Sequence, residues 1–117
     1  MRNLLLIEDN VELRGVLREA VEIDGYDVTL AENAEVGMRL LNSGYLPDFI
    51  LCDVVLPHMN GLDFLRAIRA NPQWKHIFFI AMSGSMDSKY TALEAGADYY
   101  LIKPFDFHEL FDVLAKN

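Results

Sequence analysis

The stretch "LLLIEDN", residues 4–10, joins four apolar residues directly to Glu8, Asp9 and Asn10. A continuous apolar run of this kind predicts a strand that is buried on both faces of a sheet. The strand then ends in two adjacent carboxylates, whose like charges repel each other. A fold that places this pair together must supply a compensating positive charge.

The same pattern returns twice further along the chain. In "FILCDVVLP" (49–57) an apolar run ends in Asp53, and in "YYLIKPF" (99–105) it ends in Lys103. The repeated apolar runs, each with a charged end, indicate several buried parallel strands rather than an alternating, half-exposed sheet.

Segments with helical spacing of apolar residues separate five short apolar runs. The runs predict strands over 3–7, 26–31, 48–53, 77–82 and 99–102. The helical stripes are Leu13, Val16, Leu17, Ala20 and Val21, then Ala34, Met38 and Leu41, then Leu62, Leu65 and Ile68, then a weak stripe over 87–95, and last Phe107, Leu110, Phe111 and Leu114. Asp106 and Glu109 predict a capping box at the start of the last helix.

Five strands that alternate with five helices predict an α/β fold, a doubly wound five-stranded parallel sheet with helices on both faces. With 117 residues, of which 52% are hydrophobic, we expect one domain over 1–117. We expect Phe105, Phe107 and Phe111 to belong to its core.

Composition excludes several functional classes. No apolar run reaches the roughly 18 residues that a membrane helix needs, and the N-terminus lacks the pattern of a signal peptide. The single cysteine, Cys52, permits no intrachain disulfide, which fits a reducing compartment, and we expect a cytoplasmic protein. A net charge of −8 without a basic cluster argues against direct nucleic-acid binding.

Parallel strands end at the same edge of a sheet, and ligands bind beyond those carboxyl ends. Glu8, Asp9, Asp53, Ser83 and Lys103 each stand at the end of a predicted strand, so we expect them to gather at one edge. Taken alone, Glu8 and Asp9 could merely cap the first helix. Asp53 and Lys103 at matching strand ends favour a functional site.

Carboxylates that gather in this way repel strongly, by roughly 4 kcal/mol for a pair about 4 Å apart at an effective dielectric near 20. Oxygen ligands without His or Cys favour a hard divalent cation, and Mg²⁺ suits a site with few carboxylates. Lys103 adds a fixed positive charge and Ser83 a hydroxyl donor. With an anion of phosphate size, these groups predict phosphoryl transfer to an aspartate.

The motifs "IEDN", "LCDVVLPHMNG", "MSG" and "YLIKPF" stand in this order along the chain. With this order and spacing the whole chain resembles a response-regulator receiver domain of two-component signalling. The resemblance implies the flavodoxin-like strand order 2-1-3-4-5, which also occurs in a chemotaxis receiver.

The resemblance also implies a role for each matching residue. Asp53 would be the phosphoacceptor, with Lys103 and Ser83 contacting the phosphoryl oxygens. The Mg²⁺ ligands would be Glu8, Asp9, Asp53 and the backbone carbonyl of Val55. Tyr100 would change rotamer together with Ser83, the Lys103–Pro104 peptide would be cis, and Pro57 and Gly61 would shape the loop after Asp53.

Val55 and Ser85 occupy positions that, in this family, tune the lifetime of the phosphate. Because a valine side chain cannot orient an attacking water, we expect slow self-dephosphorylation, well beyond seconds.

The resulting hypothesis is a signalling switch rather than an enzyme, apart from self-phosphorylation and slow autodephosphorylation. The donor would be a phosphohistidine on a sensor histidine kinase or a histidine phosphotransfer protein. Phosphorylation would change the face formed by 87–95, 99–102 and the last helix, which could contact an output domain or a second copy. No effector domain and no membrane partner are expected in this chain.

Two alternatives remain open at this point. A receiver-like module could act by docking alone and never be phosphorylated. A flavodoxin-type domain could bind a small ligand with the same strand order, although "EDNVEL" after the first strand would repel a phosphate in the absence of a metal.

Overall fold

A computed structural model describes residues 2–56 and 59–117. Strands and helices alternate along the chain, and one short 3-10 helix, η1, precedes α4. The strands are β1 (Asn3–Ile7), β2 (Asp27–Ala31), β3 (Phe49–Asp53), β4 (Phe78–Ser83) and β5 (Tyr99–Ile102). The helices are α1 (Val11–Ile23), α2 (Ala34–Asn42), α3 (Gly61–Ala70), η1 (Met86–Ser88), α4 (Lys89–Glu94) and α5 (Phe107–Lys116).

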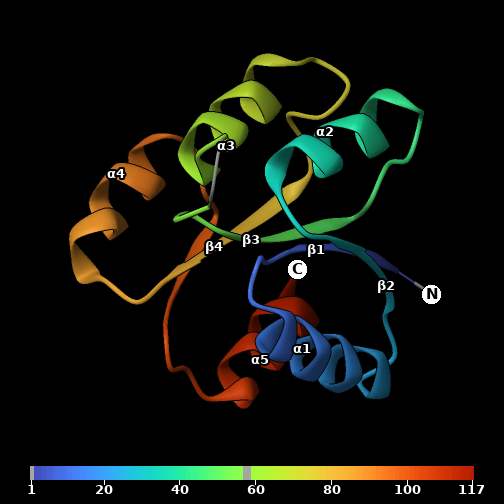
Figure 1. The fold of residues 1–117 in the computed structure, drawn as a ribbon, viewed down its shortest axis with the longest axis vertical. Coiled ribbons are helices and arrows are strands. Elements are labelled where there is room, and N and C mark those ends of the chain that lie inside the picture. Colours follow the sequence, from blue (N-terminus) through green and yellow to red (C-terminus); the bar gives the residue numbers. More distant parts are fainter. Residues whose placement is uncertain (1, 57–58) are drawn as a thin grey trace.

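The five strands form one parallel sheet in the order β2-β1-β3-β4-β5. Helices α1 and α5 cover one face of the sheet, and α2, α3 and α4 cover the other (Figure 1). The predicted fold class and strand order are therefore confirmed. In the described part of the chain, no helix is both long enough and apolar enough to cross a membrane.

The central strands contribute side chains to two separate apolar cores, one on each face of the sheet. Along β1, Leu5 and Ile7 join the core beneath α2, α3 and α4, whereas Leu4 and Leu6 join the core beneath α1 and α5. All four side chains are fully buried. Because successive strand residues point to opposite faces, a strand buried on both sides has to be apolar throughout, which explains the continuous run at the start of the chain.

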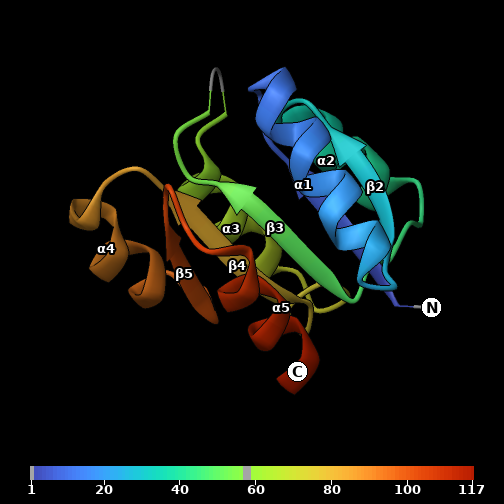
Figure 2. The same ribbon diagram turned by 90° about the horizontal axis from the view of Figure 1, so that it is seen from below.

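The strand arrows end toward one edge of the sheet, at the top of Figure 2. The chain winds outward from β1 to β2 on one side and from β3 to β5 on the other. The winding direction reverses between β1 and β3, the place where ligands generally bind in open α/β sheets. Glu8 and Asp53 stand at the ends of these two neighbouring strands.

Three predictions about local structure need correction. The helix expected over 87–95 is shorter, because η1 takes its first residues and α4 covers only Lys89–Glu94. The capping box is not formed: Asp106 accepts from the His108 N–H, but the Glu109 carboxylate accepts from the Tyr99 hydroxyl at 2.6 Å. The side chain of Glu109 is thus used to tie α5 to β5.

The third correction concerns the aromatic residues around the start of α5. Phe105, Phe107 and Phe111 are all half-buried rather than fully buried. Phe105 and Phe107 pack against the core beneath α1 and α5, so the prediction holds for them in part. The rings also contact one another, with centroids 5.9 Å apart for Phe105 and Phe107 and 6.5 Å apart for Phe107 and Phe111.

Candidate phosphorylation site

Glu8 enters the site directly from the end of β1. Its backbone N–H continues the sheet by donating to the Ala31 carbonyl, which leaves the side chain to turn inward, where only 1% of the residue is exposed. The carboxylate accepts from the Asn10 N–H at 3.1 Å through Oε2 and from Lys103 Nζ at 2.7 Å through Oε1. Glu8 is thus a buried acid whose two oxygens are both engaged.

The first helix is capped by Asn10, whose side chain accepts from the Leu13 N–H at 3.0 Å. Neither Glu8 nor Asp9 serves as this cap. The capping alternative considered for the two carboxylates is therefore wrong, and Asp9 remains available to the site.

Asp53 is the last residue of β3 and is 6% exposed. Its Oδ1 accepts from the Val55 N–H at 2.8 Å, and its Oδ2 accepts from Lys103 Nζ at 2.5 Å. One carboxylate oxygen from each of Glu8, Asp9 and Asp53 lies within 4.8 Å of the others. Such an oxygen-only set fits a small, hard divalent cation such as Mg²⁺.

Lys103 follows β5 and reaches across the edge of the sheet to both buried acids. Its own N–H donates to the Ser83 carbonyl at 2.7 Å, which fixes the start of this segment, and the Lys103–Pro104 peptide bond is cis. Burial by itself would lower the pKa of Lys103, but its hydrogen bonds to Asp53 and Glu8 outweigh this and raise the pKa. Its ammonium group therefore stays charged.

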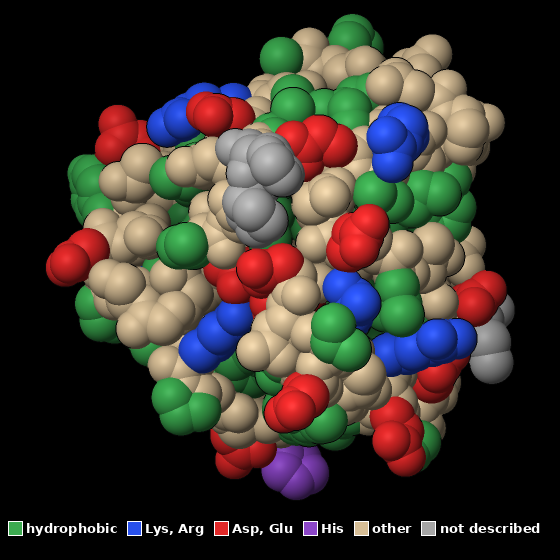
Figure 3. Space-filling view, in the orientation of Figure 1, with side chains coloured by type: hydrophobic (Ala, Val, Ile, Leu, Met, Phe, Trp, Pro, Cys, Tyr) green, Lys and Arg blue, Asp and Glu red, His purple; other side chains and the backbone are tan. Residues whose placement is uncertain are grey.

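Burial has the opposite effect on Glu8: it raises the pKa of this carboxyl, although the hydrogen bonds from Lys103 and Asn10 act against the shift. Three carboxylates face a single ammonium group, so negative charge is in excess here. Acidic side chains are also visible near the middle of the face shown in Figure 3, with basic side chains beside them. This imbalance favours binding of a cation.

Ser83 is the last residue of β4 and is 1% exposed. Its hydroxyl accepts from the Ser85 N–H at 3.2 Å, and among the described residues no hydrogen bond joins it to Asp53. Tyr100 is buried, and its hydroxyl donates to the Ser85 carbonyl at 2.5 Å. The two residues expected to move together therefore both hold Ser85, in the segment that leads to α4.

The loop after Asp53 is closely packed against the strand. The Gly61 N–H donates to the Val54 carbonyl at 3.2 Å. A methyl group on Gly61 would overlap the Asp53 carbonyl oxygen and lie 2.6 Å from Val54 Cα. Only glycine permits this approach. Val55 is 68% exposed, while Pro57, also expected to shape the loop, lies outside the described residues.

Sequence reasoning missed two side chains that hold the backbone around this site. Arg14 of α1 donates to the Glu8 carbonyl at 2.9 Å, and Glu35 of α2 accepts from the Met59 N–H at 2.9 Å. Both contacts join separate elements, and neither residue lies at the end of a strand. The one sequence feature that they share is a charged residue near the start of a helix, and this feature is too common to identify such contacts.

Comparison with known proteins agrees with this geometry. The family model for the response regulator receiver domain matches residues 4–115. This chain belongs to that family. The match supports the signalling-switch prediction over a flavodoxin-type ligand-binding domain.

The receiver domain is also similar to individual relatives. It is 38% identical over 110 residues to the transcriptional regulatory protein CpxR of Escherichia coli (strain K12), covering 94% of this chain and 46% of CpxR. The chain thus spans about half the length of the curated relatives it matches.

Two solved structures resemble the receiver domain and contain magnesium. The receiver domain of the sensor histidine kinase PA1611 from Pseudomonas aeruginosa has a magnesium ion coordinated in its active site cleft, with a TM-score of 0.86, 30% identity and coverage of 98% of this chain and 95% of that one. The response regulator TrrA from Thermotoga maritima, in complex with Mg²⁺-BeF, gives a TM-score of 0.89, 28% identity and coverage of 99% and 98%.

Proposed function

We propose that this receiver domain is a phosphorylation switch in which Asp53 accepts a phosphoryl group in a Mg²⁺-dependent reaction. One observation carries the proposal: Lys103 Nζ bonds both Glu8 and Asp53, within a group of three carboxylates that exceeds its charge. A purely structural ion pair needs no third acid. The arrangement suits the binding of a divalent cation together with an anionic phosphoryl group.

Glu8, Asp9 and Asp53 would hold Mg²⁺ together with the Val55 carbonyl. When bound, the ion would neutralise the carboxylates and the developing charge on the phosphoryl oxygens. The magnesium ion in the active site cleft of the PA1611 receiver domain supports this assignment.

In the reaction itself, an oxygen of Asp53 forms a bond to phosphorus while the bond between phosphorus and the donor nitrogen breaks. The donor is a phosphohistidine on a sensor histidine kinase or a histidine phosphotransfer protein, and its imidazole leaves with the electron pair and takes up a proton. Lys103 exchanges its carboxylate bond for a phosphoryl oxygen, and the Ser83 hydroxyl donates to another. Both contacts stabilise charge that grows in the transition state.

Once phosphorylated, the domain would shift between two states. A Ser83 hydroxyl that turns toward the phosphoryl group gives up its bond to Ser85, which Tyr100 also holds. The change would pass to the face of α4, β5 and α5, where an output domain or a second copy could bind. Docking without phosphorylation is the alternative, and it requires no reaction at Asp53.

Phosphate lifetime would depend on the side chains beside the site. Val55 is exposed and apolar, so it cannot orient a water molecule for attack, and Ser85 is occupied in capping η1 through the Asp87 N–H. We expect autodephosphorylation on a scale well beyond seconds. Decay of the isolated phosphorylated domain, followed by intact mass, measures this; a half-life of a few seconds would contradict it.

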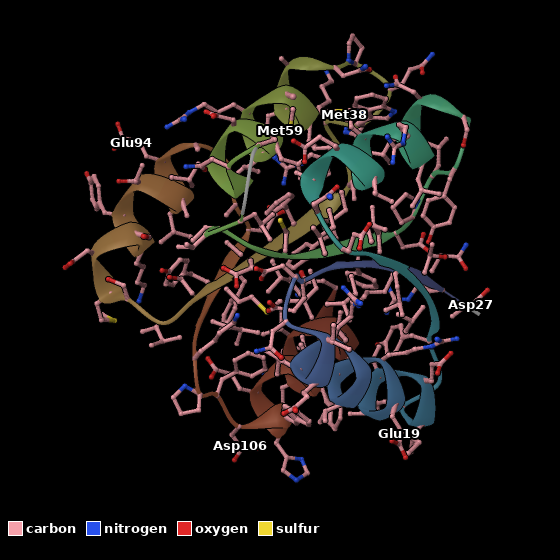
Figure 4. The ribbon with its side chains drawn as sticks, viewed as in Figure 1. Glu19, Asp27, Met38, Met59, Glu94 and Asp106 are labelled. Carbon is pink, nitrogen blue, oxygen red and sulfur yellow. The ribbon has the colours of Figure 1, made fainter. Side chains whose placement is uncertain are left out.

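The proposed function is tested by incubation with acetyl phosphate and Mg²⁺ followed by intact mass spectrometry. We expect one phosphoryl group on the wild-type domain and none on Asp53→Asn. Asp27→Asn is a matched control, since Asp27 is exposed at the start of β2, away from the site (Figure 4). Labelling of Asp53→Asn at the wild-type rate would overturn the proposal, and no labelling of wild type by acetyl phosphate or a phosphohistidine donor would favour docking alone.

A further inference from the structure

The loop between β3 and α3 has to hold Val55 in place if its carbonyl is to bind a metal ion. Among the described residues of this loop, the Val54 N–H donates to the Met82 carbonyl at 3.0 Å, the Val55 N–H donates to Asp53 Oδ1 at 2.8 Å, and the Gly61 N–H donates to the Val54 carbonyl at 3.2 Å. These bonds hold the residues next to β3 and the start of α3. Met59, on the side of the loop that leads to α3, is held from outside the loop.

Glu35 supplies such a contact from α2, a helix that contributes no residue to the acidic site. Its Oε2 accepts from the Met59 N–H at 2.9 Å, across 24 positions of the sequence. Met59 and Met38 of α2 also pack against the same apolar core. The Met59 side of the loop is thereby joined to α2 by a polar bond and by shared apolar packing.

The position of Glu35 is itself well defined. The Asn33 side chain caps α2 by accepting from the Val36 N–H at 2.8 Å, so the first helical turn is fixed. A methyl group on Gly37 would lie 2.8 Å from Ile7 Cδ1 and 3.4 Å from Phe64 Cζ, so α2 packs closely against β1 and α3. A negative charge in the first turn is also favoured by the helix dipole.

We infer that Glu35 is a positioning residue for the phosphorylation site, acting through the Met59 N–H on the loop that carries Val55. The inference rests on the proposed function. Without this bond the loop loses a polar contact with α2, and the Val55 carbonyl, earlier in the same loop, is held less firmly in a position to bind the ion. Binding of Mg²⁺ and phosphorylation of Asp53 then both weaken, although Glu35 touches neither the ion nor the acceptor.

The test is a Mg²⁺ titration followed by backbone amide chemical shifts on wild type, Glu35→Ala, Glu35→Gln and Glu19→Ala. We expect Glu35→Ala to weaken Mg²⁺ binding by up to about tenfold, the lower end of the effect of losing a group that bonds a metal ligand directly, because Glu35 acts through the loop instead. Glu35→Gln keeps a carbonyl acceptor and should restore near-wild-type affinity. Glu19→Ala removes the same charge from α1, far from the loop (Figure 4), and should change nothing.

Rescue by glutamine separates positioning from a general effect of charge. If Glu35→Gln binds Mg²⁺ as weakly as Glu35→Ala, the hydrogen-bond account is overturned. If wild type binds Mg²⁺ and Glu35→Ala binds it equally well, the inference fails while the proposed function stands. If wild type binds no Mg²⁺, the proposed function fails and takes this inference with it.

Discussion

Lys103 and Arg69 are two partly buried cations at opposite ends of β5, and their surroundings differ. The Lys103 side chain is 22% exposed and faces an excess of carboxylates. The Arg69 side chain is 20% exposed and donates to the carbonyls of Gly96, Lys75 and Ile77 and to Asp98. The two side chains are therefore buried to a similar extent, but the charges around Lys103 are unbalanced whereas Arg69 is fully paired.

This is the difference that we expect between a charge that serves a ligand site and a charge that serves only the fold. Arg69 ties the end of α3 to the turn before β5 through backbone acceptors and Asp98. Its charge is already compensated there, so the network does not call for a bound ion. The carboxylates around Lys103 repel one another, so the metal-free site is held together at a cost in stability. A bound cation would remove that cost.

The largest expected change in the free energy of unfolding is at Arg69, where the charges are paired. Arg69→Met should lower the free energy of unfolding by about 3 kcal/mol, because three backbone carbonyls lose their bonds to the guanidinium group and Asp98 loses one of its two donors. Urea unfolding followed by fluorescence of the buried Trp74 measures this. The folded Arg69→Met variant should still be phosphorylated at Asp53.

Arg66→Met is the matched control for that measurement. Arg66 lies one turn earlier on α3, where it forms an exposed ion pair with Asp63 at 3.3 Å. Exposed pairs of this kind contribute about 0.5 kcal/mol or less. Equal losses in the two variants would show that the Arg69 network carries no special stability.

The next effect belongs to the site. Gly61→Ala should lower the free energy of unfolding by about 2 kcal/mol, because the added methyl group displaces backbone at Asp53. The same displacement should slow labelling of Asp53 by acetyl phosphate, whereas Arg69→Met should lower stability without slowing this labelling. Gly15→Ala, where a methyl group would meet nothing within 4 Å, should instead gain up to about 1 kcal/mol. A stable, normally labelled Gly61→Ala variant would show that the loop can adjust.

The site edge could be predicted because its signal is local. The apolar runs of β1, β3, β4 and β5 each lead into a side chain of the candidate site, as at Ile7–Glu8 and at Cys52–Asp53, and parallel pairing brings those ends together. The network around Arg69 has no such signal. Its acceptors are backbone carbonyls, which every sequence offers, and their meeting with Arg69 depends on how α3 packs.

The same reason explains the other differences between prediction and structure. Glu109 fits a capping box by spacing, but the nearby Tyr99 hydroxyl takes its carboxylate. The residues of α4 have weak helical spacing of apolar side chains, so its start could not be located from the pattern. Glu35 and Arg14 reach across elements, and such contacts follow from helix packing rather than from sequence spacing.

Neutralising one acid in each region should have opposite effects. Asp98→Asn should lower the free energy of unfolding by about 2 kcal/mol, since Asp98 Oδ2 accepts from both Arg69 and the Phe79 N–H. Asp53→Asn should raise it by about 1 kcal/mol in metal-free buffer, because repulsion among the carboxylates is relieved. Urea unfolding in the presence of a chelator compares them, and a loss of stability in both variants would contradict an excess of charge at the site.

The smallest effect is that of Mg²⁺ on stability. At a free concentration three times the dissociation constant, binding to the native state alone should add about 0.8 kcal/mol and raise the melting temperature. Asp9→Asn, which removes one carboxylate from the group of three, should shrink this gain, whereas Asp27→Asn should preserve it. Thermal unfolding with Mg²⁺ and with Na⁺ at equal ionic strength separates binding from charge screening. An equal rise with both salts would mean that the carboxylates respond to ionic strength alone, and the contrast between Lys103 and Arg69 would lose its functional meaning.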